Sequence, residues 1–534
     1  MESNNIKIDG NKTFLNVKEI IVYLAHQSVF LKNTNMKEVL NRIEKIYTQT
    51  PKDIKSRLYI HLYNILKNAI INKDVPNGFF LPASRKLALI LDISRSTVNK
   101  SYDLLVLEGY VESKPGAGYL ILDLLEKTKP EIKSSKLYNY PKLSDAGISF
   151  LKNTSLINTT DDKNIAFRPG LPPLDIFPIK QWQNLSNFYW RHATYSDLSY
   201  YPASGIEPLK KNLANYLNIS RNIKCNYQQI VIVAGSLQSI YLIAKATMNL
   251  GDSILLENPT FPNVTTLFKS FRSNIIPLEL DQEGAIIKSE NLENIQNPKL
   301  IHLTPAGHYP SGTKMSKSRK LEILDWASQN HSLIIENDYE HEINSNKNDS
   351  PTLFSLDKQD RTIYLGTFNR LLHPSIRLGF MIVPFHLLET VQALQKLSHR
   401  FISPSYQYVM NQFIEKKHLL NHIKKLQQVV HERKEIMLES FNQVFDKRLR
   451  ITDSKTNGLH VLVEFPEEMN EQKCVNLLVN NNLVVHPYSK CFSVGKSKGG
   501  MILGYASVPN HSLRKKIIKM GQLFEKHLLL PGKL

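Results

Sequence analysis

The sequence predicts an α/β protein in two parts, a small winged helix-turn-helix domain followed by a much larger domain with a mostly parallel sheet. The first part is indicated by three helical stretches and a two-stranded hairpin within residues 55–122. The second is indicated by short apolar runs that alternate with helical stretches from residue 164 to residue 534. A chain of 534 residues has room for two or three domains.

Three helices are expected in the small domain. The first covers Leu58–Lys67, where apolar residues recur at helical spacing. The second opens at Leu81–Arg85, with Ser84 able to cap it. After a turn and cap at Asp92–Ser94, the third helix runs over Arg95–Leu105. Its inward face is expected to consist of Val98, Tyr102 and Leu105.

A hairpin follows, with strands at Tyr110–Ser113 and Gly118–Ile121. Helices and hairpin together predict a winged helix-turn-helix, whose third helix presents polar side chains to the major groove. A small helical domain that binds protein is the alternative. The polar first turn and the Gly-rich wing favour double-stranded DNA as the partner. The residues expected to contact DNA are Arg85, Arg95, Ser96, Thr97, Asn99 and Lys100.

Two further segments flank this domain. Residues 1–54 are expected to form a helical N-terminal extension, because Phe14–Leu31 and Met36–Tyr47 have helical apolar spacing. Its role stays open between a dimerisation or docking arm and a lid on the small domain. Residues 123–163 are rich in Lys, Ser, Asn, Thr and Asp, which predicts a linker.

The large domain, residues 164–534, contains apolar runs of the length expected for buried strands. Such runs, separated by helices, predict a mostly parallel sheet with helices on both faces. Ligands of such sheets bind beyond the carboxyl ends of the strands. The runs are Ile230–Val233, Ser253–Leu256, Leu300–Leu303, Leu333–Ile335 and Thr362–Leu365.

Composition narrows the class of protein. The formal net charge of +19 indicates a polyanionic partner, although an overall bias toward Lys, Asn and Ile contributes to it. The three cysteines, Cys225, Cys474 and Cys491, have no metal-ligand spacing, which favours a reducing, cytoplasmic setting. Neither a signal peptide nor an apolar run long enough to span a membrane is predicted.

Particular motifs resemble known families. Residues 81–121 closely resemble the GntR family of bacterial regulators. In the large domain, aminotransferase-like signatures stand at residues 167–172, 201–205, 234–238, 257–262, 304–312 and 366–380. In this order behind a GntR-like domain, they resemble the MocR subfamily. The resemblance implies a fold-type I large domain like the pyridoxal-phosphate (PLP) transferases, with a smaller C-terminal α+β subdomain. It also implies a homodimer that senses PLP, or PLP plus an amine.

The resemblance assigns residues to a cofactor pocket. The backbone N–H groups that open a helix at residues 235–237 would cradle a phosphate. Thr367 and Arg377 would hold the phosphate from the other side, Phe261 would stack on the pyridine ring, and Tyr339 would meet the ring hydroxyl. The full set is Gly235, Ser236, Leu237, Phe261, His308, Asn337, Tyr339, Thr367, Arg370 and Arg377.

Three positions depart from the family pattern. Arg370 stands where the family has the Schiff-base lysine, and a guanidinium is a poor amine nucleophile. Asn337 stands where an aspartate would pair with the pyridine nitrogen; Asp338 next to it would point away in an extended strand. The segment Gly500–Tyr505 lacks the arginine that holds a substrate carboxylate in many relatives.

These departures predict a body without catalytic residues and without covalently held PLP. Non-covalent PLP is compatible with the phosphate-side residues, as is another anion held by Arg370 and Arg377. The leading hypothesis is therefore a MocR-like, dimeric transcription regulator whose small-molecule effector is unknown. One alternative is a PLP-dependent aminotransferase with a fused DNA-binding head. Another is a ligand-free body that serves only dimerisation.

Overall fold

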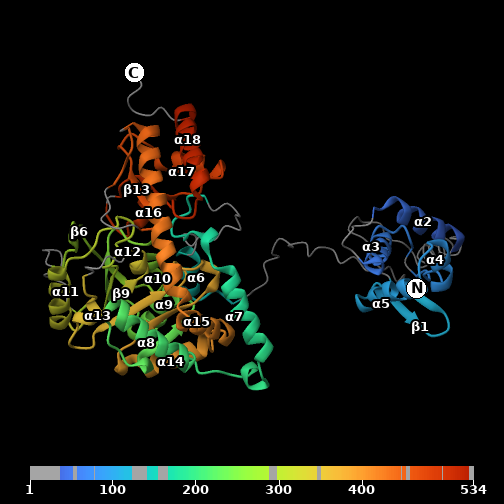
Figure 1. The fold of residues 1–534 in the computed structure, drawn as a ribbon, viewed down its shortest axis with the longest axis horizontal. Helices are drawn as coiled ribbons and strands as arrows, with labels where there is room; N and C mark the ends of the chain where they lie inside the picture. The colour runs from blue at the N-terminus through green and yellow to red at the C-terminus, as the bar shows by residue number, and fades with distance from the viewer. Residues whose placement is uncertain are drawn as a thin grey trace, which may run out of the picture. The chain divides into compact units, whose positions relative to one another are not determined.

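The computed structural model describes residues 36–51, 57–76, 78–122, 141–153, 166–287, 297–344, 350–446, 448–452, 458–495 and 497–527. The chain divides into two compact units, Met1–Pro141 and Lys142–Leu534 (Figure 1). The expected helix at Phe14–Leu31 lies outside the described residues.

The described residues of the first unit form four helices and a hairpin around one apolar core. Its elements are α2 (Met36–Gln49), α3 (Leu58–Ile71), α4 (Ser84–Ile90), α5 (Arg95–Leu107), β1 (Val111–Lys114) and β2 (Gly118–Ile121). The inward face expected for the third helix is confirmed, because Val98, Tyr102 and Leu105 are fully buried. Helix α2 belongs to the same core through Val39 and Ile43. The fold of this unit is the predicted winged helix-turn-helix with one helix added before it.

The two helix starts of the helix-turn-helix differ in their capping. Ser94 precedes α5, and its hydroxyl accepts a hydrogen bond from the backbone N–H of Thr97 at 3.1 Å. The expected cap at Ser84 was wrong: Ala83 holds the capping position of α4 without a side-chain bond. Ser84 Oγ instead accepts a bond from Arg95 Nε at 3.3 Å, which joins the two helices.

A helix lies within the segment that the sequence predicts as a linker. Helix α6 (Asp145–Asn153) packs against α10 (Pro262–Ser270) and the residues just after it. Phe150 contacts Phe271 edge to face, with ring centroids 5.8 Å apart, and Ser149 Oγ donates to the Lys269 carbonyl at 3.2 Å. Asp145 adds an ion pair with Arg272 at 3.1 Å. These contacts make α6 part of the surface of the large unit.

The large unit is built on a seven-stranded sheet in the order β3-β11-β10-β9-β8-β4-β5. All neighbouring strands are parallel except β11, which is antiparallel to both of its neighbours. The predicted mostly parallel sheet is thus confirmed. The strands are β3 (Ile230–Val233), β4 (Ser253–Glu257), β5 (Asn274–Leu278), β8 (Leu300–Leu303), β9 (Leu333–Asp338), β10 (Thr362–Thr367) and β11 (Gly379–Ile382).

Helices cover both faces of this sheet because its strands are apolar on both sides. In β10, Ile363 and Leu365 pack toward α9, α10 and α14, whereas Tyr364 packs into the core on the other face. On that other face, β4, β8 and β9 pack against α11 and α13. Besides α10, the helices of this part of the large unit are α7 (Ile179–His192), α8 (Glu207–Arg221), α9 (Ser236–Thr247), α11 (Lys317–Gln329), α12 (His341–Asn344), α13 (Leu353–Leu356), α14 (Phe385–Ser398) and α15 (Pro404–Glu415).

A smaller α+β subdomain completes the large unit. Figure 1 shows α16 (His418–Phe445) running from the main body into this subdomain, where it lies beside α18 (Asn510–His527). Its sheet has the order β12-β13-β15-β14 and is antiparallel throughout. The strands of this sheet are β12 (Arg450–Ile451), β13 (Val461–Glu464), β14 (His486–Pro487) and β15 (Gly500–Leu503). The subdomain also contains α17 (Glu471–Asn480).

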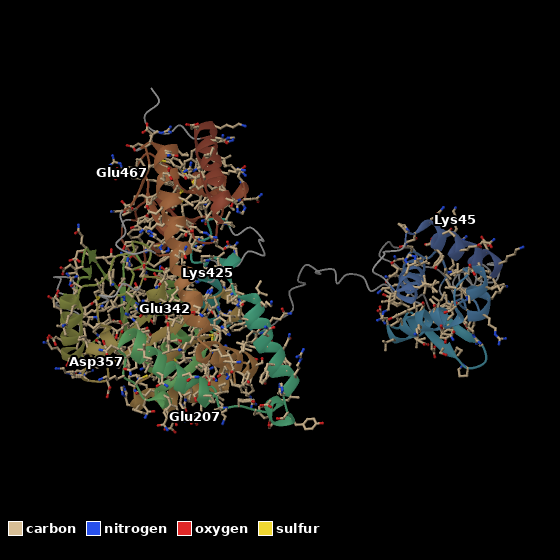
Figure 2. All side chains as sticks on the ribbon, viewed as in Figure 1. Lys45, Glu207, Glu342, Asp357, Lys425 and Glu467 are labelled. Carbon is tan, nitrogen blue, oxygen red and sulfur yellow. The ribbon has the colours of Figure 1, made fainter. Side chains whose placement is uncertain are left out.

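Short elements complete the description: η2 (Leu174–Ile176), η3 (Tyr195–Leu198), η4 (Tyr227–Gln229), β6 (Leu280–Asp281), β7 (Gly284–Ala285), η6 (Pro374–Ile376) and η7 (Tyr488–Cys491). Polar side chains surround both units, from Lys45 on α2 to Glu467 before α17 (Figure 2). Within the described part of the chain, none of the helices is long and apolar enough to cross a membrane.

Candidate functional site

The expected DNA-contacting surface lies on the first turns of α5. Arg95, Ser96 and Lys100 are exposed there, and Thr97 and Asn99 are partly exposed. The Ser94 cap fixes the start of this helix, so the side chains project from a defined first turn. The backbone N–H groups at the start of a helix also favour a phosphate.

Arg85 extends this surface onto α4. Its side chain is exposed, and it forms no hydrogen bond or ion pair with the described residues. Arg95 is positioned by the bond that its Nε donates to Ser84 Oγ. The structure therefore brings the predicted DNA-contacting residues to two helices that pack directly against each other.

In the large unit, the residues predicted to hold a phosphate lie where β3 turns into α9. Gly235 makes this turn with a φ of 131°, a conformation that favours glycine. A Cβ on Gly235 would lie 2.7 Å from Asn369 Nδ2 and 3.9 Å from Thr367 Oγ1. The backbone N–H groups of Ser236 and Leu237 therefore open α9 beside the carboxyl end of β10.

Asn369 ties the anchoring segment to this turn. Its backbone N–H donates to Thr367 Oγ1 at 3.2 Å, and its Nδ2 donates to the carbonyl of Ala234 at 3.5 Å. Its Oδ1 accepts from the N–H of Leu378 at 3.2 Å. The asparagine that replaces the family serine thus holds β3, β10 and β11 together at the pocket edge.

Arg377 lies at the end of the same segment, directly after η6. Its backbone is left-handed, with a φ of 47°, which is uncommon for a residue with a side chain. Its guanidinium is exposed and forms no hydrogen bond or ion pair with the described residues. It remains available to a ligand or to a second copy of the chain.

Arg370 reaches the part of the pocket where the ring of a cofactor would lie. Its Cζ is 5.9 Å from the ring centroid of Phe261 and 5.5 Å from that of Tyr339, which are cation–π distances. Gly170 leaves room for it, because a Cβ there would lie 1.4 Å from Arg370 Nη1. The guanidinium therefore contacts the two aromatic residues predicted to surround the ring.

The positive charge of Arg370 contributes to the pKa shifts of several buried titratable groups. Burial raises the pKa of Glu340, and the Arg370 charge opposes that rise. Burial, reinforced by Arg370, lowers the pKa of His460 to about 3. Burial, with Arg168 and Arg370, lowers the pKa of His486 to about 4. Both imidazoles are therefore neutral near pH 7, and Glu340 is held toward its neutral form.

Asn337 lies in β9 beside His302 of β8. Asn337 Nδ2 and His302 Nε2 are 3.2 Å apart, and both side chains are buried. Asn337 Oδ1 has no hydrogen-bond partner in the described structure. Because a buried polar atom without a partner is costly, this amide is suited to a ligand atom that can hydrogen-bond to it.

Asp338 points to the other face of β9. Its Oδ2 pairs with Arg221 Nη2 at 2.6 Å and accepts from the hydroxyl of Tyr364 at 2.8 Å. Burial would raise the pKa of Asp338, but Arg221 and its other partners hold that pKa below its ordinary value. This carboxylate is committed to a structural ion pair and does not replace the missing aspartate at position 337.

His308 and Tyr339 are held by the chain itself. His308 Nε2 lies 2.8 Å from the carbonyl of Pro259, and its Nδ1 lies 2.8 Å from Ser311 Oγ. Since the carbonyl can only accept, Nε2 carries the proton and Nδ1 accepts from the serine. Tyr339 OH donates to the carbonyl of Gly307 at 3.0 Å. Both ring nitrogens of His308 are therefore used by the protein.

The position of the absent carboxylate clamp is apolar. Ile502 of β15 is fully buried in a cluster that includes Tyr309, Tyr339 and Leu462. Phe261 packs against the same cluster, with its ring centroid 5.2 Å from that of Tyr309. The segment Gly500–Tyr505 therefore supplies aromatic and aliphatic contacts and no positive charge of its own.

Residues 177–500, more than half of the chain, match the aminotransferase class I and II family. The chain belongs to this family. Residues 58–121 match the gntR family of bacterial regulatory proteins, which places a DNA-binding domain in front of the aminotransferase domain. This combination makes the chain a member of the MocR subfamily, and the predicted fold class is confirmed.

Two regulators match most of the chain, and a solved aminotransferase structure matches the larger part of it. The HTH-type transcriptional regulator YhdI of Bacillus subtilis is 29% identical, over 88% of this chain and 96% of the relative. The probable rhizopine catabolism regulatory protein MocR of Rhizobium meliloti is 27% identical, over 89% and 95%. An archaeal alanine:glyoxylate aminotransferase structure matches 72% of this chain and 96% of its own, with a TM-score of 0.64 and 22% identity, which shows the fold.

The residues of this family member fit part of a PLP site. The turn at Gly235, the start of α9 and Thr367 offer polar groups for a phosphate, and Asn337 Oδ1, which has no partner in the described structure, can accept a hydrogen bond from a ring. Arg370 does not fit a Schiff base, because a guanidinium remains protonated at working pH. A Schiff base between PLP and Arg370 thus does not fit the chemistry of this position.

Sequence reasoning missed the groups that surround Arg370 from distant segments. Glu340 could have been suspected, since it directly follows Tyr339. His460 and His486 had no local signal, because the C-terminal subdomain brings them close only in the folded chain.

Proposed function

We propose that this MocR-type protein regulates transcription by binding DNA through α5 and a small anionic ligand in its aminotransferase-like body, without transamination. The observation that carries the proposal is Arg370. It stands at the anchoring position of the predicted pocket, beside Tyr339, in a chain that also carries a GntR-family domain.

Catalytic inertness follows from the chemistry of the anchor. PLP, when held on a lysine, supplies an electron sink and a Schiff-base exchange partner. Transamination needs that lysine amine as nucleophile and proton carrier. Arg370 can hold a charge and donate hydrogen bonds but performs neither task. His308 is no substitute base, because both of its ring nitrogens are engaged.

The role of the body is then to bind a ligand non-covalently. Gly235 and the start of α9 would hold a phosphate, Phe261 would stack on a ring, and Asn337 would hydrogen-bond to the ring edge. Non-covalent PLP satisfies these features. Ligand binding would couple to DNA binding through differential affinity of the ligand for the two states of the protein.

The DNA-binding half of the proposal is tested by fluorescence anisotropy with the DNA upstream of the coding sequence. Binding should weaken with salt and prefer that DNA over a scrambled duplex. Arg95→Ala should weaken binding by about 1–3 kcal/mol if it contacts a base, or lower the salt slope by about 1 if it contacts a phosphate.

Lys45→Ala is the matched control, because it removes the same charge from the same unit. Lys45 is exposed on α2, well separated from the hairpin in Figure 2. Equal losses in Arg95→Ala and Lys45→Ala, or binding without sequence preference, would contradict the proposed interface.

The cofactor half is tested by absorbance and mass spectrometry of the protein with added PLP, before and after borohydride. We expect saturable PLP binding without a borohydride-fixed adduct. An aldimine band with amine turnover would favour the alternative of an active aminotransferase. Saturable binding of no PLP-like compound would favour a body that serves only dimerisation.

The dimer proposal rests on one apolar surface of the body. Around α7, at the outer edge of the body in Figure 1, and the following turn η3, large apolar side chains are exposed. They include Tyr195 at 95%, Tyr200 at 79% and Trp190 at 58% exposure. A second copy would bury this surface. Analytical ultracentrifugation of the Trp190→Ser/Tyr195→Ser double variant should show monomers where the unmodified chain forms dimers; dimers in both would contradict it.

A further inference from the structure

Arg370 presents donors that the protein does not satisfy. A guanidinium carries five N–H donors and no acceptor. Within the described ranges, the Arg370 side chain forms no hydrogen bond and no ion pair, although it is only partly exposed. Donors that are partly removed from water without acceptors are costly, so the site is suited to a ligand that supplies acceptors.

The guanidinium is also held in place. Phe261 and Tyr339 both contact it at cation–π distance, and Gly170 packs so closely that any side chain there would overlap it. A planar guanidinium on aromatic rings keeps its N–H edges for acceptors, and its fork matches the two oxygens of a carboxylate. The position of the charge is therefore set by the fold before a ligand arrives.

The surrounding groups do not compensate this charge. The Arg370 charge opposes the rise of the Glu340 pKa, but the two side chains form no ion pair in the described structure. Burial of Glu340 favours the neutral acid. His460 and His486 are neutral near pH 7. The ring site thus carries the positive charge of Arg370 on the edge where relatives carry the aldehyde-binding lysine.

We propose that the pocket selects an aromatic phosphate ester that carries a carboxylate on the ring edge facing Arg370. Its simplest form is 4-pyridoxic acid 5′-phosphate, in which a carboxylate stands in place of the PLP aldehyde. The phosphate would lie at the start of α9, and the carboxylate would accept two hydrogen bonds from Arg370. The proposal rests on the non-covalent ligand site proposed above and names the chemistry that this site prefers.

The charge distribution of the pocket supports this choice. The segment Gly500–Tyr505 supplies no positive charge, so a second acidic group beside Ile502 would meet the apolar side chains of that cluster. Groups that can bind an acidic ligand lie at two ends of the ring site, at the start of α9 and at Arg370. A ligand with one acidic group at each end therefore matches the pocket.

The test compares three ligands that share ring and phosphate and differ at one carbon: 4-pyridoxic acid 5′-phosphate, PLP and pyridoxine 5′-phosphate. Calorimetry with the full chain should show the carboxylate compound binding at least about tenfold more tightly than the hydroxymethyl compound, which is about 1.4 kcal/mol. Phosphate-free 4-pyridoxic acid and inorganic phosphate should each bind more weakly than the compound that has both groups.

Two variants assign the preference to Arg370. Arg370→Gln should bind the three compounds with equal affinity, because it keeps the phosphate end and loses the charge. Arg370→Lys, which keeps a charge but loses the fork, should lose most of the carboxylate preference and gain a borohydride-fixed PLP adduct. Arg377→Gln should weaken all three phosphate compounds by the same factor.

The possible results separate this inference from the proposed function. Equal affinity for the three compounds in the unmodified chain, or tightest binding of PLP, would overturn the carboxylate preference and leave non-covalent binding standing. A preference that survives in Arg370→Gln would overturn the role of Arg370. Binding of none of the compounds would overturn both ligand proposals, while the DNA-binding assay would still decide the regulator proposal.

Discussion

Asp338→Asn should destabilise the body of the protein because it removes one half of a buried ion pair. The side chains of Arg221 and Asp338 are only 6% and 1% exposed, and the two charges are 2.6 Å apart. Removing one partner of such a pair leaves a buried charge and typically costs about 3–5 kcal/mol. An asparagine can still accept the bond from Tyr364, so we expect the lower part of that range.

Urea unfolding followed by tryptophan fluorescence measures this loss in the body alone. All three tryptophans, Trp182, Trp190 and Trp326, belong to the large unit. The midpoint should fall with little change in slope. Asp325→Asn is the control, since this exposed aspartate undergoes the same charge change and should shift stability by no more than about 0.5 kcal/mol.

The pH dependence provides a second check. The pKa of Asp338 is held below its unfolded value of 3.8, so its stabilisation is present above that value and is lost as pH falls through the folded pKa. The difference between variant and parent should therefore be largest near neutral pH and should shrink in acid. An unchanged midpoint at pH 7, or a difference that grows in acid, would refute the reasoning.

Three other predictions concern the cap, a buried acid and the contact with Arg370. Ser94→Ala should destabilise the start of α5 by about 1 kcal/mol, which hydrogen exchange at the α5 amides would reveal as faster exchange relative to a Ser113→Ala control at an exposed position of β1. Burial raises the pKa of Glu257 to about 7, so the parent loses stability as pH rises from 4.5 through 7; Glu257→Gln should gain up to about 3 kcal/mol relative to the parent over that interval in urea unfolding, and a constant difference would contradict this. Gly170→Ala should displace the Arg370 guanidinium and strain a backbone with a φ of 78°, so calorimetry should show a weaker carboxylate preference without loss of phosphate binding.

Much of the fold could be predicted because its strongest signals are local. The buried runs at Ile230–Val233 and Leu300–Leu303 are apolar on both faces, which favours central strands of a covered sheet. The Ser94 cap likewise follows from neighbouring residues. Helix α6 could not be predicted in this way, because nine residues rarely form a stable helix without the contacts that α10 provides. The same holds for Ser84, whose hydroxyl is used by Arg95 and not by its own helix.

The candidate site could likewise be predicted where its signals are local, and could not be predicted where it depends on distant segments. The motifs identify Gly235, Thr367 and Arg370 because each lies at the carboxyl end of a strand, where ligands of such sheets bind. The environment of Arg370 depends on His460 and His486, which only the folding of the C-terminal subdomain brings near it. Sequence reasoning therefore identifies the charge at the anchor but not the neutral groups that leave it uncompensated.

Helix α6 sets a limit on the reach of the DNA-binding unit. Because α6 is docked on α10, the chain leaves the body at Asp145 and not at Ala166. Residues 123–144 can span at most about 75 Å, whereas residues 123–165 could span about 145 Å if α6 were released. The docked helix therefore nearly halves the largest distance that the segment connecting the two units can span.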